Sequence, residues 1–180
     1  MKGCDNMNIL FESERVYFVN VDMKYIDDYL IMINNPNIQD FVSMKPTIYN
    51  YEDEVEWVKS CGYNGENTYS VINKADGNFI GNVSFKIIDD VSAEIGICIT
   101  PDFQDKHYGT EILKRLVEYG FNDLNFDEIC LKVFSHNARA IHCYKKIGFI
   151  EYDVIKNVKK SNGIAVDDIH MKIKKMDYFK

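Results

Sequence analysis

The stretch EIGICITPDFQDKHYGTEIL, residues 94–113, decides the fold because it passes from a strand pattern to a helix pattern. Alternating apolar residues predict a strand that Pro101 ends, and apolar residues at helical spacing predict a helix over about 108–122. The first turn of a helix presents unpaired backbone N–H groups and a partial positive charge, which suit an anion such as phosphate. Gly109 would let that anion approach the backbone, and Lys106 would add positive charge at the rim.

On both sides of this stretch, segments of high strand propensity alternate with amphipathic helical segments. The predicted strands are 15–21, 69–72, 79–88, 93–100, 129–134, 149–157 and 165–175. The predicted helices are 23–34, 52–61, 108–122 and 138–147. Pro36 ends the first helix, so we expect a loop from there through Pro46. Turn residues at 75–77 and at 162–163 predict two hairpins.

These elements predict one α/β domain of the α+β kind, spanning 9–180 after a polar tail at 1–8. We expect a central mixed, mostly antiparallel sheet of about six to seven strands, flanked by about four helices. A chain of 180 residues with 46% hydrophobic residues is long enough to bury the core of such a domain.

The net charge of the chain is −7, from 21 Lys and Arg against 28 Asp and Glu. This charge argues against nucleic-acid binding by general phosphate attraction and against an anionic membrane surface. Residues 1–100 carry 16 acids and 7 bases, whereas residues 101–180 carry 12 acids and 14 bases. The split predicts that the first part favours a cation and the second an anion, although an uneven solvated surface would look the same.

The five cysteines lie far apart without a CxxC spacing, which indicates reduced thiols in a reducing compartment. The sequence has no signal-peptide pattern and no apolar run of about 18 residues that would span a membrane. We therefore expect a cytoplasmic protein without a membrane partner.

A second informative segment runs from Asn137 to Phe149. Asn137 suits the N-cap of a helix, a structural role that would explain it on its own. Tyr144 falls on the apolar face of this helix, where a tyrosine usually serves packing. Gly148 suits the position just after the helix ends.

The order Gln-x-x-x-x-Gly at 104–109, followed by Asn-x₆-Tyr-x-x-x-Gly-Phe at 137–149, resembles the GNAT superfamily of acyl-CoA-dependent N-acyltransferases. The resemblance covers about residues 12–175 and is sharpest over 94–149. Within the superfamily, the chain looks most like the Rim-type protein N-terminal acetyltransferases and the spermidine N-acetyltransferases. The resemblance implies an enzyme that moves the acetyl group of acetyl-CoA, its cosubstrate, to a primary amine.

The resemblance also implies which residues bind and react. Those assigned to cofactor binding are Ile97, Cys98, Ile99, Gln104, Asp105, Lys106, His107, Tyr108, Gly109, Thr110, Asn137, Ala140 and Tyr144. Backbone N–H groups of the turn would hold the pyrophosphate, and the strand residues would line the pantetheine arm. Tyr144 would protonate the departing thiolate, because a phenol with a pKa of about 10 keeps its proton at neutral pH. Glu94 would take a proton from the acceptor ammonium, directly or through water.

The sequence departs from the family pattern at two points. His107 stands where the family has its first loop glycine, but histidine adopts positive φ more readily than most residues. Its imidazole could therefore face a phosphate or weaken cofactor binding. The loop at 40–46 lacks the paired carboxylates typical of spermidine enzymes, and Lys45 disfavours spermidine there. The acceptor stays open between a small cationic amine or polyamine and a protein N-terminus.

Two other functions are compatible with the sequence, a catalytically silent CoA-binding sensor and an interaction domain without a cofactor. A homodimer is also compatible, because GNAT proteins often pair. The acids at 52–56 would face a cationic acceptor, unless they only stabilise the first turn of a helix. Basic residues fall in segments expected near the phosphates, namely Lys106, His107, His136, Arg139, Lys145 and Lys146.

Overall fold

The computed structural model describes residues 7–61 and 66–180. Its strands are β1 (Ile9–Glu12), β2 (Val16–Asn20), β3 (Glu66–Asn73), β4 (Phe79–Asp89), β5 (Ser92–Ile99), β6 (Glu128–Phe134), β7 (Ile150–Ser161) and β8 (Ile164–Lys174). Its α-helices are α1 (Ile26–Ile33), α2 (Pro36–Val42), α3 (Tyr51–Ser60), α4 (Tyr108–Asn122), α5 (Ala138–Ile147) and α6 (Lys175–Tyr178). Short 3₁₀ turns precede α1 (Met23–Tyr25) and α4 (Pro101–Phe103).

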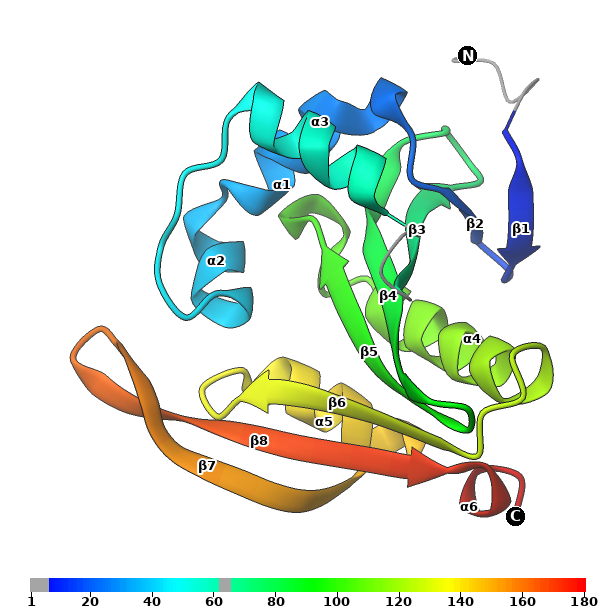
Figure 1. The fold of residues 1–180 in the computed structure, drawn as a ribbon, viewed down its shortest axis with the longest axis vertical. Coiled ribbons are helices and arrows are strands. Elements are labelled where there is room, and N and C mark those ends of the chain that lie inside the picture. The colour runs from blue at the N-terminus through cyan, green and yellow to red at the C-terminus, as the bar shows by residue number, and fades with distance from the viewer. Residues whose placement is uncertain (1–6, 62–65) are drawn as a thin grey trace.

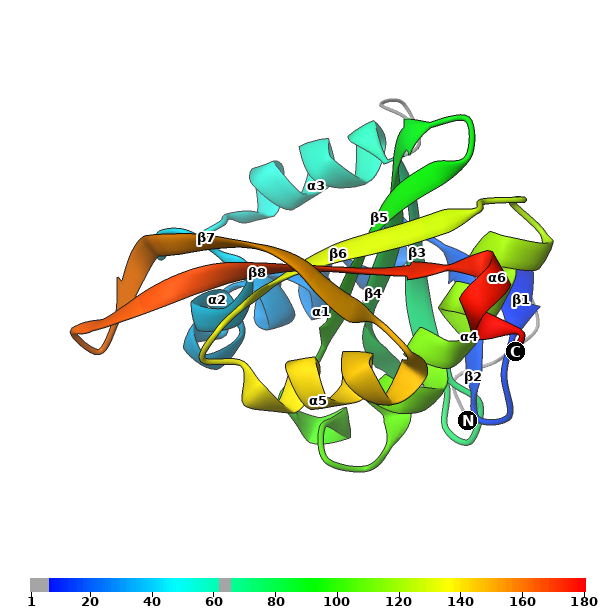
Figure 2. The ribbon, with the colours of Figure 1, turned by 90° about the horizontal axis from the view of Figure 1, so that it is seen from below.

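The strands form one sheet in the order β1-β2-β3-β4-β5-β6-β8-β7 (Figure 1). Helices α1, α2 and α3 lie on one face of this sheet, and α4 and α5 lie on the other (Figure 2). The α4 face buries the larger apolar cluster, which includes Phe85, Leu116 and Phe121. A smaller cluster around Tyr29 and Ile72 fills the other face. Two layers of helices therefore enclose the sheet, as the alternation of strand and helix patterns predicts.

The sheet opens between its two parallel strands. β5 pairs with β6 only where Ser92–Glu94 faces Glu128–Cys130, and the two strands separate beyond that point (Figure 1). On its other side β5 stays paired with β4 up to Ile99. Backbone polar groups of β5 on the β6 side are therefore left without a strand partner next to the opening.

The predicted class is confirmed, because the sheet is mixed and only its β5–β6 pair is parallel. The described part of the chain has eight strands and six α-helices, compared with the predicted six to seven and about four. The additional strand is β1, and the additional helices are α2 and α6. Helix α4 has the bounds that the sequence predicts, 108–122. The two predicted hairpins form as β3–β4 and β7–β8.

The loop predicted from Pro36 through Pro46 is wrong, because Pro36 begins α2. Asn35 caps this helix, and its side chain accepts a hydrogen bond from the N–H of Asn37 at 3.0 Å. A proline in the first turn loses only an N–H that has no helical partner there. The same residue can therefore end one helix and start the next.

The predicted tail at 1–8 falls mostly outside the described residues, although Met7 packs beside the smaller apolar cluster. Cys98, Cys130 and Cys143 are free thiols. Over 7–61 and 66–180, no helix has both the length and the apolar character needed to cross a membrane. Nor do three or more His, Cys, Asp or Glu side chains of these ranges gather where they could hold a metal ion.

Candidate functional site

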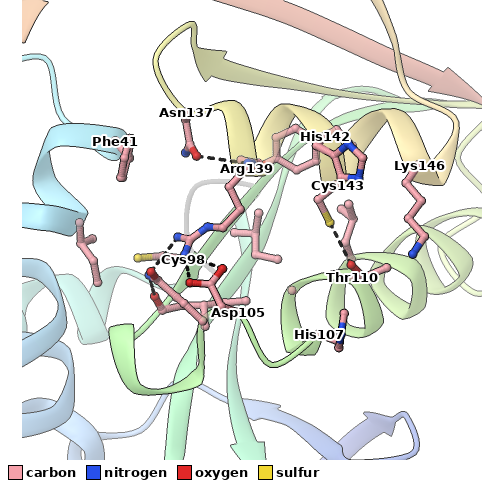
Figure 3. A pocket seen from close by; sticks show the side chains of 18 of the residues that line it. Phe41, Cys98, Asp105, His107, Thr110, Asn137, Arg139, His142, Cys143 and Lys146 are labelled. Carbon is pink, nitrogen blue, oxygen red and sulfur yellow. Dashed lines mark hydrogen bonds and ion pairs between the residues drawn. The ribbon is translucent and has the colours of Figure 1, made fainter.

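A cavity of about 380 Å³ opens where β5 and β6 separate (Figure 3). Its lining comes from α2, the end of β5, the turn before α4, the first turns of α4, and one side of α5. The lining residues are Ile38, Phe41, Val42, Ile97, Cys98, Ile99, Gln104, Asp105, His107, Gly109, Thr110, Leu113, Asn137, Arg139, Ala140, His142, Cys143, Tyr144 and Lys146. The volume is within the range of about 300–1,000 Å³ that small-molecule sites have.

The turn before α4 reaches the helix through two residues with left-handed backbone, Asp105 with φ of 56° and His107 with φ of 65°. His107 thus adopts a conformation that usually favours glycine, and its side chain lines the cavity. A Cβ added at Gly109 would meet only Ile99 Cδ1, at 3.5 Å. The first turn of α4 therefore leaves room for a ligand beside its N–H groups.

Side chains brace this turn against α5. Gln104 donates a hydrogen bond from Nε2 to the carbonyl of Ile99 at 2.7 Å, and its Oε1 accepts one from Arg139 at 2.7 Å. Arg139 also forms an ion pair with Asp105 at 3.2 Å. The bracing uses the charge of Arg139 and neutralises Asp105, which would otherwise repel a phosphate.

One lysine of α5 remains as a free cation at the cavity. Lys146 lines the cavity, and no described residue forms an ion pair with it (Figure 3). Its neighbour Lys145 is outside the lining and pairs with Glu151 at 2.7 Å. Lys146 can therefore give its charge to a bound anion.

Tyr144 is 8% exposed and lines the cavity from α5. Burial raises the pKa of its phenol above the ordinary value of 10.0, because the phenolate would lose its hydration. No described residue accepts or donates a hydrogen bond at its hydroxyl. The phenol is thus protonated at neutral pH and can donate to a ligand.

Three further polar residues of the lining, Asn137, Thr110 and Cys143, have structural partners. Asn137 caps α5, since its Oδ1 accepts a hydrogen bond from the N–H of Ala140 at 3.2 Å. Thr110 and Cys143 join α4 to α5 through an Oγ1–Sγ contact of 3.4 Å. Burial raises the pKa of the Cys98 thiol to about 12, so it stays protonated and unreactive as a nucleophile.

Three residues assigned from the sequence do not line the cavity: Glu94, Lys106 and Tyr108. Glu94 lies at the last β5–β6 pair and forms an ion pair with Lys132 at 2.8 Å. Lys106 and Tyr108 contact Arg15 instead. The Arg15 guanidinium donates a hydrogen bond to the carbonyl of Lys106 at 3.2 Å and lies 4.0 Å from the centre of the Tyr108 ring. The other eleven assigned residues line it.

Sequence reasoning missed the wall that α2 contributes, because a loop was expected there. Ile38, Phe41 and Val42 come from this helix, and apolar residues at helical spacing were its signal. The further missed lining residues are Leu113, His142 and Cys143, whereas Arg139 and Lys146 were expected near the phosphates and line the cavity. Arg139, His142 and Lys146 are three and four residues apart and so share one face of α5.

The acids at 52–56 serve α3 itself. The Asp53 carboxylate accepts a hydrogen bond from the backbone N–H of Asn50 at 2.8 Å, and the Asn50 side-chain oxygen accepts one from the N–H of Asp53 at 3.0 Å. Glu54 is buried, and the lining found within the described ranges includes no acid of α3. This placement favours the interpretation as first-turn charge over direct contact with an acceptor.

The helix N-terminus at the cavity, the strand edge beside it and the buried phenol are compatible with an acyl-CoA-dependent N-acyltransferase. The sequence model of the acetyltransferase (GNAT) domain matches residues 15–150. The chain therefore belongs to the GNAT family, and it is an N-acetyltransferase.

Known proteins agree with this assignment. The chain is 33% identical over 134 residues to the spermidine N(1)-acetyltransferase of Vibrio cholerae, covering 72% of this chain and 74% of that protein. It is 23% identical over 171 residues to the N-acetyltransferase p20 of Bacillus licheniformis, covering 92% and 96%. A crystal structure of the Vibrio cholerae spermidine N-acetyltransferase with CoA and spermine superposes with a TM-score of 0.82 and 26% identity, covering 92% and 98%.

The cosubstrate of GNAT enzymes is acetyl-CoA, and the cavity fits it. The first turn of α4 and Lys146 suit a pyrophosphate, since both offer donors and positive charge. Ile97, Ile99 and Leu113 give an apolar wall for the thioester arm, next to the unpaired edge of β5.

Proposed function

We propose that this protein transfers the acetyl group of acetyl-CoA to a small cationic primary amine, with a polyamine as the acceptor class. The observation that carries the proposal is a group of carboxylates beside the opening, on the sheet face opposite α4: Glu94, Asp153 and Asp168. Glu94 points to that face, because it alternates along β5 with Ile95 and Ile97, which pack on the α4 side. An ammonium group would be attracted to this side of the opening.

Three carboxylates share that face through the strand register. Lys132 of β6 pairs with Glu94 and lies opposite His170 of β8. His170 lies 3.4 Å from Asp168 and 3.9 Å from Asp153. Asp168 Oδ1 is buried without a hydrogen-bond partner in the described part of the chain. Lys86 lies opposite Glu94 on the same face, and Lys172 of this face pairs with Glu128. Among the described residues, neither Asp168 nor Asp153 forms an ion pair with a lysine, so these two carboxylates can attract an ammonium group.

The relatives support the same acceptor class. The Vibrio cholerae relative is named a spermidine N(1)-acetyltransferase, and its structure contains spermine beside CoA. Lys45, which disfavours spermidine in the sequence pattern, is exposed and is not part of the cavity lining. It therefore does not oppose a polyamine at the opening directly.

The mechanism follows from the positions of the lining groups. Acetyl-CoA supplies an activated acetyl thioester. The turn before α4 would bind its pyrophosphate, and the free backbone groups at Ile97–Ile99 would orient the thioester arm and polarise the carbonyl. Tyr144 would donate its proton to the departing sulfur.

Phosphate binding by Lys146 gives a first prediction. We expect Lys146→Met to raise the KM for acetyl-CoA about tenfold or more, because it removes a charge-assisted contact to phosphate. Lys145→Met is the matched control, since Lys145 pairs with Glu151 outside the cavity. Steady-state kinetics at saturating amine measure both variants. Equal effects of the two substitutions would assign the contribution to general surface charge instead.

Deprotonation of the amine gives a second prediction. An amine with a pKa of about 10 is mostly ammonium at neutral pH and cannot attack a thioester. We propose that Glu94 accepts its proton through water, because the carboxylate lies outside the cavity lining. Glu94→Gln should lower kcat/KM for the amine about 10²-fold.

The matched control for this prediction is Glu128→Gln. Glu128 also faces a lysine across neighbouring strands, Lys172 at 3.1 Å, but at the closed end of the β5–β6 pair. The Glu128→Gln variant should keep the wild-type kcat/KM for the amine. An unchanged kcat/KM for the amine in Glu94→Gln would mean that water or another group removes the proton.

The experiment that tests the proposed function is an acceptor panel with acetyl-CoA and detection of the released thiol. The panel contains spermidine, spermine, an aminoglycoside, and a peptide with a free N-terminus. The highest kcat/KM for a polyamine supports the proposal, whereas the highest value for the peptide would overturn the acceptor class. Calorimetric binding of CoA with no turnover on any amine would indicate the silent sensor instead.

A further inference from the structure

Helix α2 forms the wall of the cavity on the side of the N-terminal helices. Ile38, Phe41 and Val42 of this helix line the cavity. α2 has seven residues, and a helix this short is not stable without contacts from the rest of the protein. The contacts that the rest of the protein makes with α2 must therefore set the position of this helix and the width of the opening.

The C-terminal end of α2 is held by a residue cluster that we name the α2 latch: Asp40, His136, Lys159 and Ser161. Asp40 accepts hydrogen bonds from Ser161 Oγ at 2.8 Å and from His136 Nε2 at 3.0 Å. Its second carboxylate oxygen lies 3.7 Å from Lys159 Nζ. Partial burial alone would raise the pKa of Asp40, but these partners outweigh it and hold the pKa below its usual range.

Lys159 is the strongest anchor of the latch, because its side chain is only 7% exposed. Its ammonium donates hydrogen bonds to the carbonyls of Asp40 and Ser43, the latter at 2.9 Å. It also lies 4.0 Å above the ring of Phe134. A buried ammonium is stable only when such partners satisfy it, so the geometry of α2 relative to Lys159 is tightly specified.

A β-bulge in β7 aims Lys159 at α2. The β7–β8 register shifts between Ile155 and Lys159, and Asn157 there has a φ of 57°. Asp167 of β8 fixes the bulge by accepting hydrogen bonds from the Lys156 ammonium at 2.8 Å and the Asn157 N–H at 3.0 Å. Bulges commonly redirect a side chain in this way. Figures 1 and 2 show the far end of the β7–β8 hairpin reaching to the side of α2.

The latch touches the cavity wall through aromatic rings. The His136 ring, held by Asp40, lies 5.0 Å from the ring of Phe41, which lines the cavity. On its other side the same imidazole lies 6.0 Å from Phe134. A displaced Asp40 would therefore move both α2 and the ring that packs against Phe41.

We propose that Lys159 and Asp40 are positioning residues that lock α2 against the β7–β8 hairpin and thereby set the acceptor side of the opening. The inference rests on the proposed amine acetyltransferase activity. The latch is on the α2 side of the opening, whereas the turn before α4 and Lys146 hold the cosubstrate. A weakened latch should therefore lower kcat/KM for the amine more than it raises the KM for acetyl-CoA.

The test is Lys159→Met, which keeps the length of the side chain and removes its charge. We expect kcat/KM for the amine to fall about 10- to 100-fold, because small displacements at a reacting centre have effects of this size. The KM for acetyl-CoA should change much less, because the turn before α4 and Lys146, which would bind the pyrophosphate, are not part of the latch. Backbone amides of α2 should exchange hydrogen faster than in the wild type, while those of α4 keep their protection.

Lys74→Met is the matched control, because Lys74 pairs with Glu12 of β1 at 2.6 Å, at the opposite edge of the sheet from β7. It should leave the amine kinetics and the α2 exchange unchanged. If Lys159→Met does not fold, Ser161→Ala removes one hydrogen bond to Asp40 and tests the same latch more mildly. The Lys159→Met, Asp40→Asn double variant should be no worse than the more damaging single one.

The outcomes separate the two proposals. An amine kcat/KM and an α2 exchange rate that both stay at wild-type values in Lys159→Met would overturn the latch. A parallel rise in KM for both substrates would also overturn it, since that indicates general loosening. If the wild type acetylates no amine, the proposed function fails, and α2 exchange in Lys159→Met still decides the latch.

Discussion

Tyr144→Phe is expected to lower kcat by about 10²–10⁴-fold while changing the affinity for acetyl-CoA little. The substitution removes one hydroxyl and keeps the ring, which packs near Phe149 with ring centres 6.0 Å apart. Because no described residue is hydrogen-bonded to this hydroxyl, its loss leaves no protein partner unsatisfied. Single-turnover kinetics and calorimetric CoA binding separate the rate effect from binding.

The pH profile is a second readout of this prediction. Burial disfavours the phenolate and raises the pKa of Tyr144, so the phenol stays protonated up to pH of about 10 and beyond. The wild-type kcat should therefore show no alkaline decline from Tyr144 below that pH. A decline near neutral pH that disappears in Tyr144→Phe would contradict the assigned role.

Tyr69→Phe is the matched control for Tyr144→Phe. Tyr69 is 7% exposed, and burial raises its pKa too, but it packs against Phe11 in the core instead of lining the cavity. Its loss should leave kcat near the wild-type value. Equal losses in both variants, or an active Tyr144→Phe enzyme, would show that another group protonates the sulfur.

Gly81→Ala is expected to lower the free energy of unfolding by about 3 kcal/mol or more. A Cβ at this position would overlap the carbonyl oxygen of Cys98 and lie 2.9 Å from its carbonyl carbon. Both are backbone atoms, so β4 and β5 would have to move apart, and rotation of a side chain cannot relieve the overlap. Cys98 lines the cavity, so CoA affinity should also fall in the fraction that folds.

Urea unfolding followed by circular dichroism measures this effect, and Gly109→Ala is the control. A Cβ at Gly109 makes only an ordinary contact with Ile99 at 3.5 Å, and alanine favours a helix more than glycine does. The control should therefore be as stable as the wild type or slightly more stable. A Gly81→Ala protein of wild-type stability would mean that the strands can separate here at little cost.

Several elements of the fold were predictable because their signals are local. The apolar residues of α4 recur with the helical period, and turn residues at 75–77 and 162–163 fix both hairpins. In contrast, Pro36 gives the same signal whether it ends one helix or begins another. β1 spans only four residues, too few for a clear alternation, so it was not predicted.

The sequence by itself determined the family and predicted eleven residues of the cavity lining, because the turn before α4 and Tyr144 belong to short motifs with fixed spacing. Tertiary structure alone decided which charges remain free. It paired Glu94 with Lys132 and Arg139 with Asp105, and it left Lys146 facing the cavity. It also joined Asp40 to a lysine 119 residues away. Such contacts depend on how strands pair and bulge across the sheet, and no pattern in a local stretch of sequence carries that information.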